Sequence, residues 1–405
     1  MRKHCIVYLI LFLFISVCTI ALAEEGEKVP DQEKSHPFVQ FVENIFKKIE
    51  FVTGLTTAYD SNIFLSEDNE SSDLITILTQ NISLELPEDP YYFELDYTGI
   101  LSYYMEEGDN IHSHTANFLF SYRPFDNLSF GLGNYFKKMH TRTISTVFGD
   151  RLLSRGYKED SPVFEIKYEP TEKTMIDVAA RYYWIDAVSP DDDYIDRDQL
   201  TGNIAVNYDI WSDLTGFIGY RAQDAHFPNL SSKDAMGHRG FAGFTKKFDT
   251  FNIRAEVGQE HKDTFFQGND ANTDFRIGID STFSTFTMLN LNLTFNEVSP
   301  SARKEYFQYF TNAIDIGFWR LLNPKTSIST NVSYRIQDFD SSDVLSGNAA
   351  EDRKTDIISA STFLTRNLND WLKLNLGYAF TKRNTDFAQE GYTDNRISFG
   401  LIASY

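Results

Sequence analysis

Cysteine is almost absent from this chain of 405 residues, and both cysteines, Cys5 and Cys18, lie close to its start. No disulfide framework and no thiol chemistry are therefore expected in the rest of the chain. Long apolar runs are lacking too, since after residue 23 no stretch approaches the roughly 20 residues that a membrane-spanning helix needs. If the remaining chain crosses a bilayer, it must do so with strands.

Catalytic signatures are also missing. There is no Gly-x-Ser-x-Gly elbow and no His-Glu-x-x-His motif, and we predict neither an enzyme nor a cofactor. His112 and His114 stand two apart, and residues 191–193 are three aspartates, but solvated histidines and a solvated acidic loop explain these features better than a metal site. The net charge of −21 and the absence of a basic patch exclude nucleic acid as a partner.

The first 48 residues differ from the rest. Cations at positions 2 and 3, an apolar stretch from Ile6 to Ile20 and the sequence Ala21-Leu22-Ala23 predict a signal peptide over residues 1–23, exported through the Sec pathway. Residues 24–48 predict a periplasmic leader followed by a short amphipathic helix that begins at Pro37. The helix has several possible roles: plugging a pore, lying on the membrane, docking a periplasmic partner, or packing below the rest of the chain.

From Ile49 onward the chain alternates between apolar and polar residues. In the last segment Ile397, Phe399 and Leu401 share one face, and the pattern continues to a terminal aromatic, Tyr405. Tight turns rich in Pro, Asn and Asp separate such segments, and they alternate with longer acidic connections. Short turns on one rim and long loops on the other are typical of bacterial outer-membrane barrels.

The fold prediction is therefore all-β, a transmembrane antiparallel up-and-down barrel over residues 49–405. About 18 strands are expected, with 16 as the alternative. A β-sandwich would also alternate, but it does not require every connection on one rim to be tight.

The polar face of each predicted strand would line the lumen of such a barrel. The predicted lumen-lining and solute-contacting residues are Glu94, Asp96, Asp177, Arg181, Asp209, Arg221, Arg254, Glu256, Arg276, Asp280, Asp315 and Arg335. Mixed charges with Asn, Thr and Tyr suit a hydroxyl-rich solute such as a polysaccharide or oligosaccharide. The simpler interpretation is that these charges only hydrate a wet lumen.

Two short motifs resemble known signals. Tyr59-Asp60-Ser61-Asn62 at the end of the first predicted strand resembles the β-barrel porin 2 family. That resemblance implies an integral outer-membrane component of exopolysaccharide export, with a periplasmic polysaccharide-export protein as a partner. At the other end, Ser398, Gly400 and Tyr405 resemble the signal that the barrel-assembly machinery reads.

The sequence thus predicts a barrel in the Gram-negative outer membrane, in contact with its lipid. The favoured hypothesis is the translocation pore of exopolysaccharide export. The alternatives are a general or sugar-selective nutrient porin, and a structural or adhesive barrel with a closed lumen.

Overall fold

The computed structural model describes residues 48–65, 70–106, 110–139, 144–145, 152–153, 156–188, 196–229, 234–264, 268–284, 286–300, 308–339, 352–387 and 390–404. None of these segments forms a helix long and apolar enough to cross a membrane. The signal peptide, the leader up to residue 47 and the amphipathic helix predicted above lie outside the described residues, as does Tyr405.

Eighteen strands form one antiparallel sheet: β1 (Ile49–Asp60), β2 (Asp73–Glu88), β3 (Tyr91–Tyr104), β4 (Asn110–Phe125), β5 (Leu128–Met139), β8 (Tyr157–Thr171), β9 (Thr174–Ala187), β10 (Arg197–Trp211), β11 (Leu214–His226), β12 (Ala235–Lys247), β13 (Phe251–Thr264), β14 (Gly268–Ser284), β15 (Thr287–Pro300), β16 (Gln308–Asn323), β17 (Thr326–Phe339), β18 (Arg353–Asn367), β19 (Leu372–Thr385) and β20 (Tyr392–Ser404). Two short strands, β6 (Ile144–Ser145) and β7 (Leu152–Leu153), pair only with each other.

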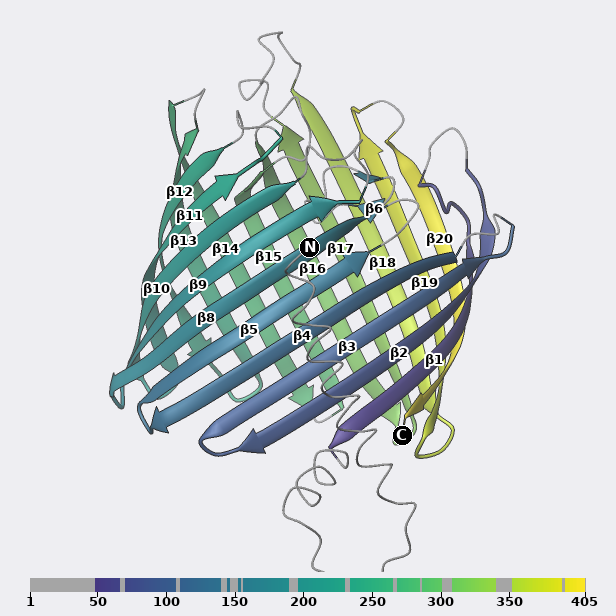
Figure 1. Cartoon of the computed structure of the whole chain (residues 1–405), viewed down its shortest axis with the longest axis horizontal. Helices are drawn as coiled ribbons and strands as arrows, with labels where there is room; N and C mark the ends of the chain where they lie inside the picture. The colour runs from purple at the N-terminus through teal and green to yellow at the C-terminus, as the bar shows by residue number, and fades with distance from the viewer. Residues whose placement is uncertain are drawn as a thin grey trace, which may run out of the picture. The chain divides into compact units, whose positions relative to one another are not determined.

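The sheet closes on itself. Each strand pairs with its neighbours in sequence, apart from β5, which pairs with β8 past the small hairpin. β1 then pairs with β20 in a continuous register from Val52 opposite Ser404 to Asp60 opposite Arg396. In Figure 1 the purple β1 accordingly lies beside the yellow β20. The predicted closed barrel of 18 strands is confirmed, and the 16-strand alternative is wrong.

The two rims differ as the sequence predicts. The turn rim carries the connections at residues 89–90, 126–127, 172–173, 212–213, 248–250, 285–286, 324–325 and 368–371, whereas most connections on the loop rim are longer. Asparagine shapes these turns: Asn369 Oδ1 accepts hydrogen bonds from the backbone N–H groups of Trp371 and Leu372. At the same rim Lys246 donates a hydrogen bond to Asp213, which lowers the pKa of that carboxyl.

Alternation gives the barrel an apolar outer face. Large apolar side chains stand exposed on it from strand to strand, for example Leu55 at 53%, Ile218 at 64% and Ile397 at 60%. In water such a continuous apolar surface would drive association, whereas a lipid bilayer covers it. The face assignment made from the last strand therefore extends around the whole cylinder.

The seam between β1 and β20 can be tested by cross-linking. Leu55 and Leu401 are directly opposite, and opposed Cα atoms lie roughly 4.5–5.5 Å apart, within the range of a disulfide. We expect Leu55→Cys with Leu401→Cys to form a disulfide on mild oxidation, measured as a mobility shift on a non-reducing gel. The control pairs Leu55→Cys with Ile397→Cys, four residues out of register; equal cross-linking of both pairs would contradict this closure.

Candidate functional site

The polar face of the strands points into the barrel. The Arg197 guanidinium on β10 interacts electrostatically with the Tyr309 hydroxyl on β16, although five strands lie between β10 and β16 in the sheet. Such an interaction can only run through the interior. Because side chains alternate along a strand, the face of Arg197 and its register partners is the lumen face on every strand.

The Tyr-Asp-Ser-Asn motif lies at the loop-rim end of the seam. Asp60 accepts hydrogen bonds from Arg396 Nη2 at 2.7 Å and from the backbone N–H of Asn62 at 3.0 Å. Ser61 Oγ accepts one from the backbone of Asn395, and Asn62 donates one to the carbonyl of Thr393. These bonds tie the end of the first strand to the start of the last, so the motif has a local role in closing the barrel.

Two residues of the predicted assembly signal lie in the same seam. Ser398 is opposite Ala58, and Gly400 is opposite Thr56. A Cβ at position 400 would lie 2.5 Å from Thr56 Oγ1, closer than two such atoms can stand. Glycine therefore leaves room for the Thr56 hydroxyl here, and the role of Ser398, Gly400 and Tyr405 in assembly stays a prediction.

An ion-pair chain crosses the lumen wall from β12 to β15. Its members, each paired with the next, are Arg254, Glu256, Arg239, Asp274, Arg276 and Glu297. Three of them, Arg254, Glu256 and Arg276, were predicted to line the lumen. Register brings them together with three residues that the sequence analysis missed.

Arg239 is the centre of the ion-pair chain. Its Nη2 lies 2.7 Å from Asp274 and 2.8 Å from Glu256, and its Nε donates a second bond to Asp274. The three side chains are 5%, 5% and 10% exposed. Burial strengthens a pair whose hydrogen bonds are complete, but leaves a large cost if one partner is removed.

Two phenylalanines pack beside this chain over glycines. Phe217 on β11 lies across Gly243, and Phe241 on β12 lies across Gly219, so that a Cβ at either glycine would overlap the facing ring. The Arg254 guanidinium stacks 4.1 Å from the Phe217 ring centre. Unlike Arg239, Arg254 keeps 56% of its side chain exposed, and it presents its charge to the lumen.

An acidic arc occupies the opposite wall. Glu85 on β2 and Glu94 on β3 are directly opposite each other, Tyr92 donates a 2.7 Å hydrogen bond to Glu94, and Asp96 lies within hydrogen-bonding reach of Glu94. β2 and β3 are nine strands from β13 and β14 in a cylinder of eighteen. The arc thus faces the part of the wall that holds Arg254 and Arg276.

The remaining predicted lumen residues do not gather in one cluster. Most of them lie at separate positions of the lumen face: Asp177 and Arg181 on β9, Asp209 on β10, Asp280 on β14, Asp315 on β16 and Arg335 on β17. Arg221 on β11 is the exception, because it is directly opposite Arg239 of the ion-pair chain. Asp177 accepts a bond from Asn207, and Asp209 accepts one from Thr215. A single binding centre made from the whole predicted set is therefore not what the fold builds.

Near the loop rim, aromatic side chains that the sequence analysis missed pack on the lumen face. Tyr309 on β16, Phe339 on β17 and Phe387, two residues beyond the end of β19, form one buried cluster with ring centres 5.1 Å apart in each contact. On the other side Arg197 lies 5.1 Å from the Tyr183 ring and 5.9 Å from the Phe227 ring. Near the turn rim, by contrast, lumen-facing Asp209 and Asp280 are exposed.

Metal binding finds no support in the described part of the chain. There, no group of three His, Cys, Asp or Glu side chains is placed to hold a metal ion. His114 Nδ1 is hydrogen-bonded to the Tyr97 hydroxyl at 2.7 Å on the outer face, and residues 191–193 lie outside the described residues.

Comparison with known proteins identifies the fold. No protein-family model and no curated protein matches the sequence, so the resemblance to the β-barrel porin 2 family stays a prediction. In fold, the barrel resembles Pseudomonas aeruginosa OccK2. The crystal structure of OccK2 in complex with glucuronate aligns with a TM-score of 0.50 and 9% identity, over 88% of this chain and 98% of OccK2. A BenF-like porin from Pseudomonas fluorescens aligns with a TM-score of 0.49 and 9% identity, over 89% of this chain and 99% of that porin.

The ion-pair chain predicts unequal costs for two arginine substitutions. Arg239→Met leaves Glu256 and Asp274 buried without their cation, and we expect it to lower the free energy of unfolding by about 3–5 kcal/mol. Arg254→Met removes a largely exposed cation and should cost about 1 kcal/mol or less. Urea unfolding in lipid vesicles measures both, and equal losses would show that Arg239 is not the central residue of the chain.

Proposed function

We propose that this protein is a channel of the Gram-negative outer membrane that passes small hydrophilic solutes. This is the nutrient-porin alternative of the sequence analysis. The observation that carries it is a closed barrel of 18 strands with an apolar outer face and a polar lumen face that is exposed to solvent near the turn rim. Barrels of 16 to 18 strands are wide enough to leave an aqueous passage.

Exopolysaccharide export, the favoured hypothesis from the sequence, gains no support. The motif on which it rests serves the seam, and the aromatic packing near the loop rim favours a narrow passage. The likeness in fold is to OccK2, whose structure holds the small sugar acid glucuronate. A periplasmic export protein is accordingly not part of this proposal, whereas lipid against the outer face is.

The charge distribution of the lumen suggests which ions such a channel prefers. The acidic arc holds three carboxylates, whereas the ion-pair chain on the opposite wall balances three arginines with three carboxylates. A wall with surplus negative charge concentrates cations near it within a Debye length of about 8–10 Å. We therefore propose a weak preference for cations over anions.

Planar-bilayer recordings across a salt gradient test the proposal. The wild-type chain should conduct with a reversal potential that favours cations. Replacing Glu85, Glu94 and Asp96 with the corresponding amides should shift that potential toward anions, while Arg254→Gln should shift it toward cations. Asp370→Asn, in a turn at the rim, serves as the control and should shift it least.

The recordings also distinguish a channel from a structural or adhesive barrel with a closed lumen. A protein that migrates as a folded, heat-modifiable barrel but never conducts would overturn the channel and favour the structural or adhesive barrel. Conductance with equal shifts in all three variants would preserve the channel and overturn the role of the two walls.

A further inference from the structure

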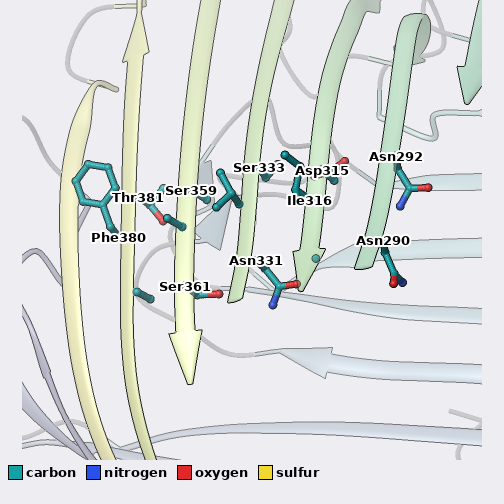
Figure 2. A pocket seen from close by; sticks show the side chains of 14 residues that line it. Asn290, Asn292, Asp315, Ile316, Asn331, Ser333, Ser359, Ser361, Phe380 and Thr381 are labelled. Atoms are coloured by element: carbon teal, nitrogen blue, oxygen red, sulfur yellow. The ribbon is translucent and has the colours of Figure 1, made fainter. Parts of the chain in front are cut away.

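A groove runs along the lumen face of β15 to β19, beside the ion-pair chain. It has a volume of about 370 Å³ and is lined by residues of five consecutive strands, some of which Figure 2 labels. We call it the amide–hydroxyl groove, after Asn290, Asn292, Asn331, Ser333 and Ser359, together with the carboxylate of Asp315. Its volume lies at the lower end of the range of about 300–1,000 Å³ found for small-molecule sites.

Strand register builds the groove as two rows. In the first row Asn292 is opposite Asp315, Asp315 is opposite Ser333, and Ser333 is opposite Ser359. In the second row, one pleat nearer the turn rim, Asn290 and Asn331 stand on either side of Gly317. Polar groups on four neighbouring strands are thereby held by rigid backbone pairing rather than by loops.

Gly317 keeps the middle of the groove hollow. A Cβ at this position would lie 3.1 Å from Asn331 Oδ1 and 3.8 Å from Asn290 Cβ. Any side chain here would push on the Asn331 amide and occupy the space between the two asparagines. The glycine thus keeps the space between the two asparagines open.

The lining groups define the chemistry of a ligand. Amides and hydroxyls each donate and accept hydrogen bonds, and the one carboxylate only accepts them. No lysine or arginine lines the groove, in contrast to the neighbouring wall, where Arg254 and Arg276 lie. Such a lining suits a neutral molecule rich in hydroxyl groups better than an anion. The next lumen-facing position on β16 after Gly317 is Trp319, opposite Ser329, and an aromatic ring offers an apolar face to a sugar ring.

We propose that the amide–hydroxyl groove binds a neutral saccharide of one or two rings during its passage through the lumen. The proposal rests on the channel function proposed above and adds the class of solute. A polar wall that only hydrates the lumen would bind no saccharide measurably, and binding experiments therefore distinguish the two.

Maltose binding to the detergent-solubilised full chain, measured by isothermal titration calorimetry, tests the site without requiring conduction. Asn331→Ala removes an amide that can make two hydrogen bonds to a sugar, and we expect binding to weaken about fivefold to tenfold. Gly317→Val should abolish it by filling the recess. The matched control is Asn117→Ala, an amide on the lumen face of β4, which should leave the affinity unchanged.

Calorimetry tests the saccharide site, and bilayer recordings test the channel. Heat-modifiable migration on a gel shows that a variant is folded. If Gly317→Val does not assemble, the affinity of Asn331→Ala for maltose still tests the site. No maltose binding by the wild-type chain, or equal affinities in Asn331→Ala and Asn117→Ala, would overturn the saccharide site. Bilayer recordings without conductance would instead overturn the channel, whatever the calorimetry shows.

Discussion

The structure depends on the pairing of every backbone N–H and C=O group along the sheet edge. In a lipid bilayer no water replaces a missing partner, and each unpaired group costs several kcal/mol, which only a closed sheet avoids. The pairing of β1 with β20 removes both edges at once. Around it the chain concentrates specific contacts: Arg396 and Asn62 bond to Asp60 at one end of the seam, and Gly400 leaves room for the Thr56 hydroxyl.

Closure converts a simple alternation of side chains into an inside and an outside. With 18 strands, the interior is too wide for side chains projecting from the wall to fill it everywhere. The lumen accordingly has two parts that differ in how closely their side chains pack. Toward the loop rim, aromatic rings such as Tyr309 and Phe339 pack against each other, whereas toward the turn rim Asp209 and Asp280 remain exposed. Packed aromatic rings thus line the loop-rim end of the lumen, and exposed carboxylates line its turn-rim end.

The fold and the faces of the strands were predictable from sequence because they depend on local signals. A period of two along a single strand assigns its outer face, and Pro, Asn and Asp in tight turns count the strands. The amphipathic helix and the signal peptide depend on equally local signals, but they lie outside the described residues and stay predictions.

The arrangement of the site was not predictable in the same way, because it depends on register between strands. Arg254, Glu256 and Arg276 could be assigned to the lumen, yet nothing within one strand shows that Arg239 and Asp274 lie between them. The groove was missed for a different reason: Asn290, Ser333 and Gly317 carry no charge, and single uncharged residues give no signal of a site. In hindsight, the recurrence of small polar residues at lumen positions of five consecutive strands was the available clue.

The two parts of the wall act over different distances, and this determines what each can select. The ion-pair chain is balanced within itself, so its field is weak beyond Arg254, and salt screens that field within about 8–10 Å. The acidic arc acts over the same short range from the opposite side. A neutral solute senses neither. One row of register partners continues from Arg254 through Gly278 and Asn292 to Asp315 and Ser333, so the ion-pair chain and the groove adjoin along one row of the wall. In the proposed channel, ions respond to the charges of this row and of the opposite wall, whereas discrimination among uncharged molecules requires direct hydrogen bonds, which the amides and hydroxyls of the groove can make.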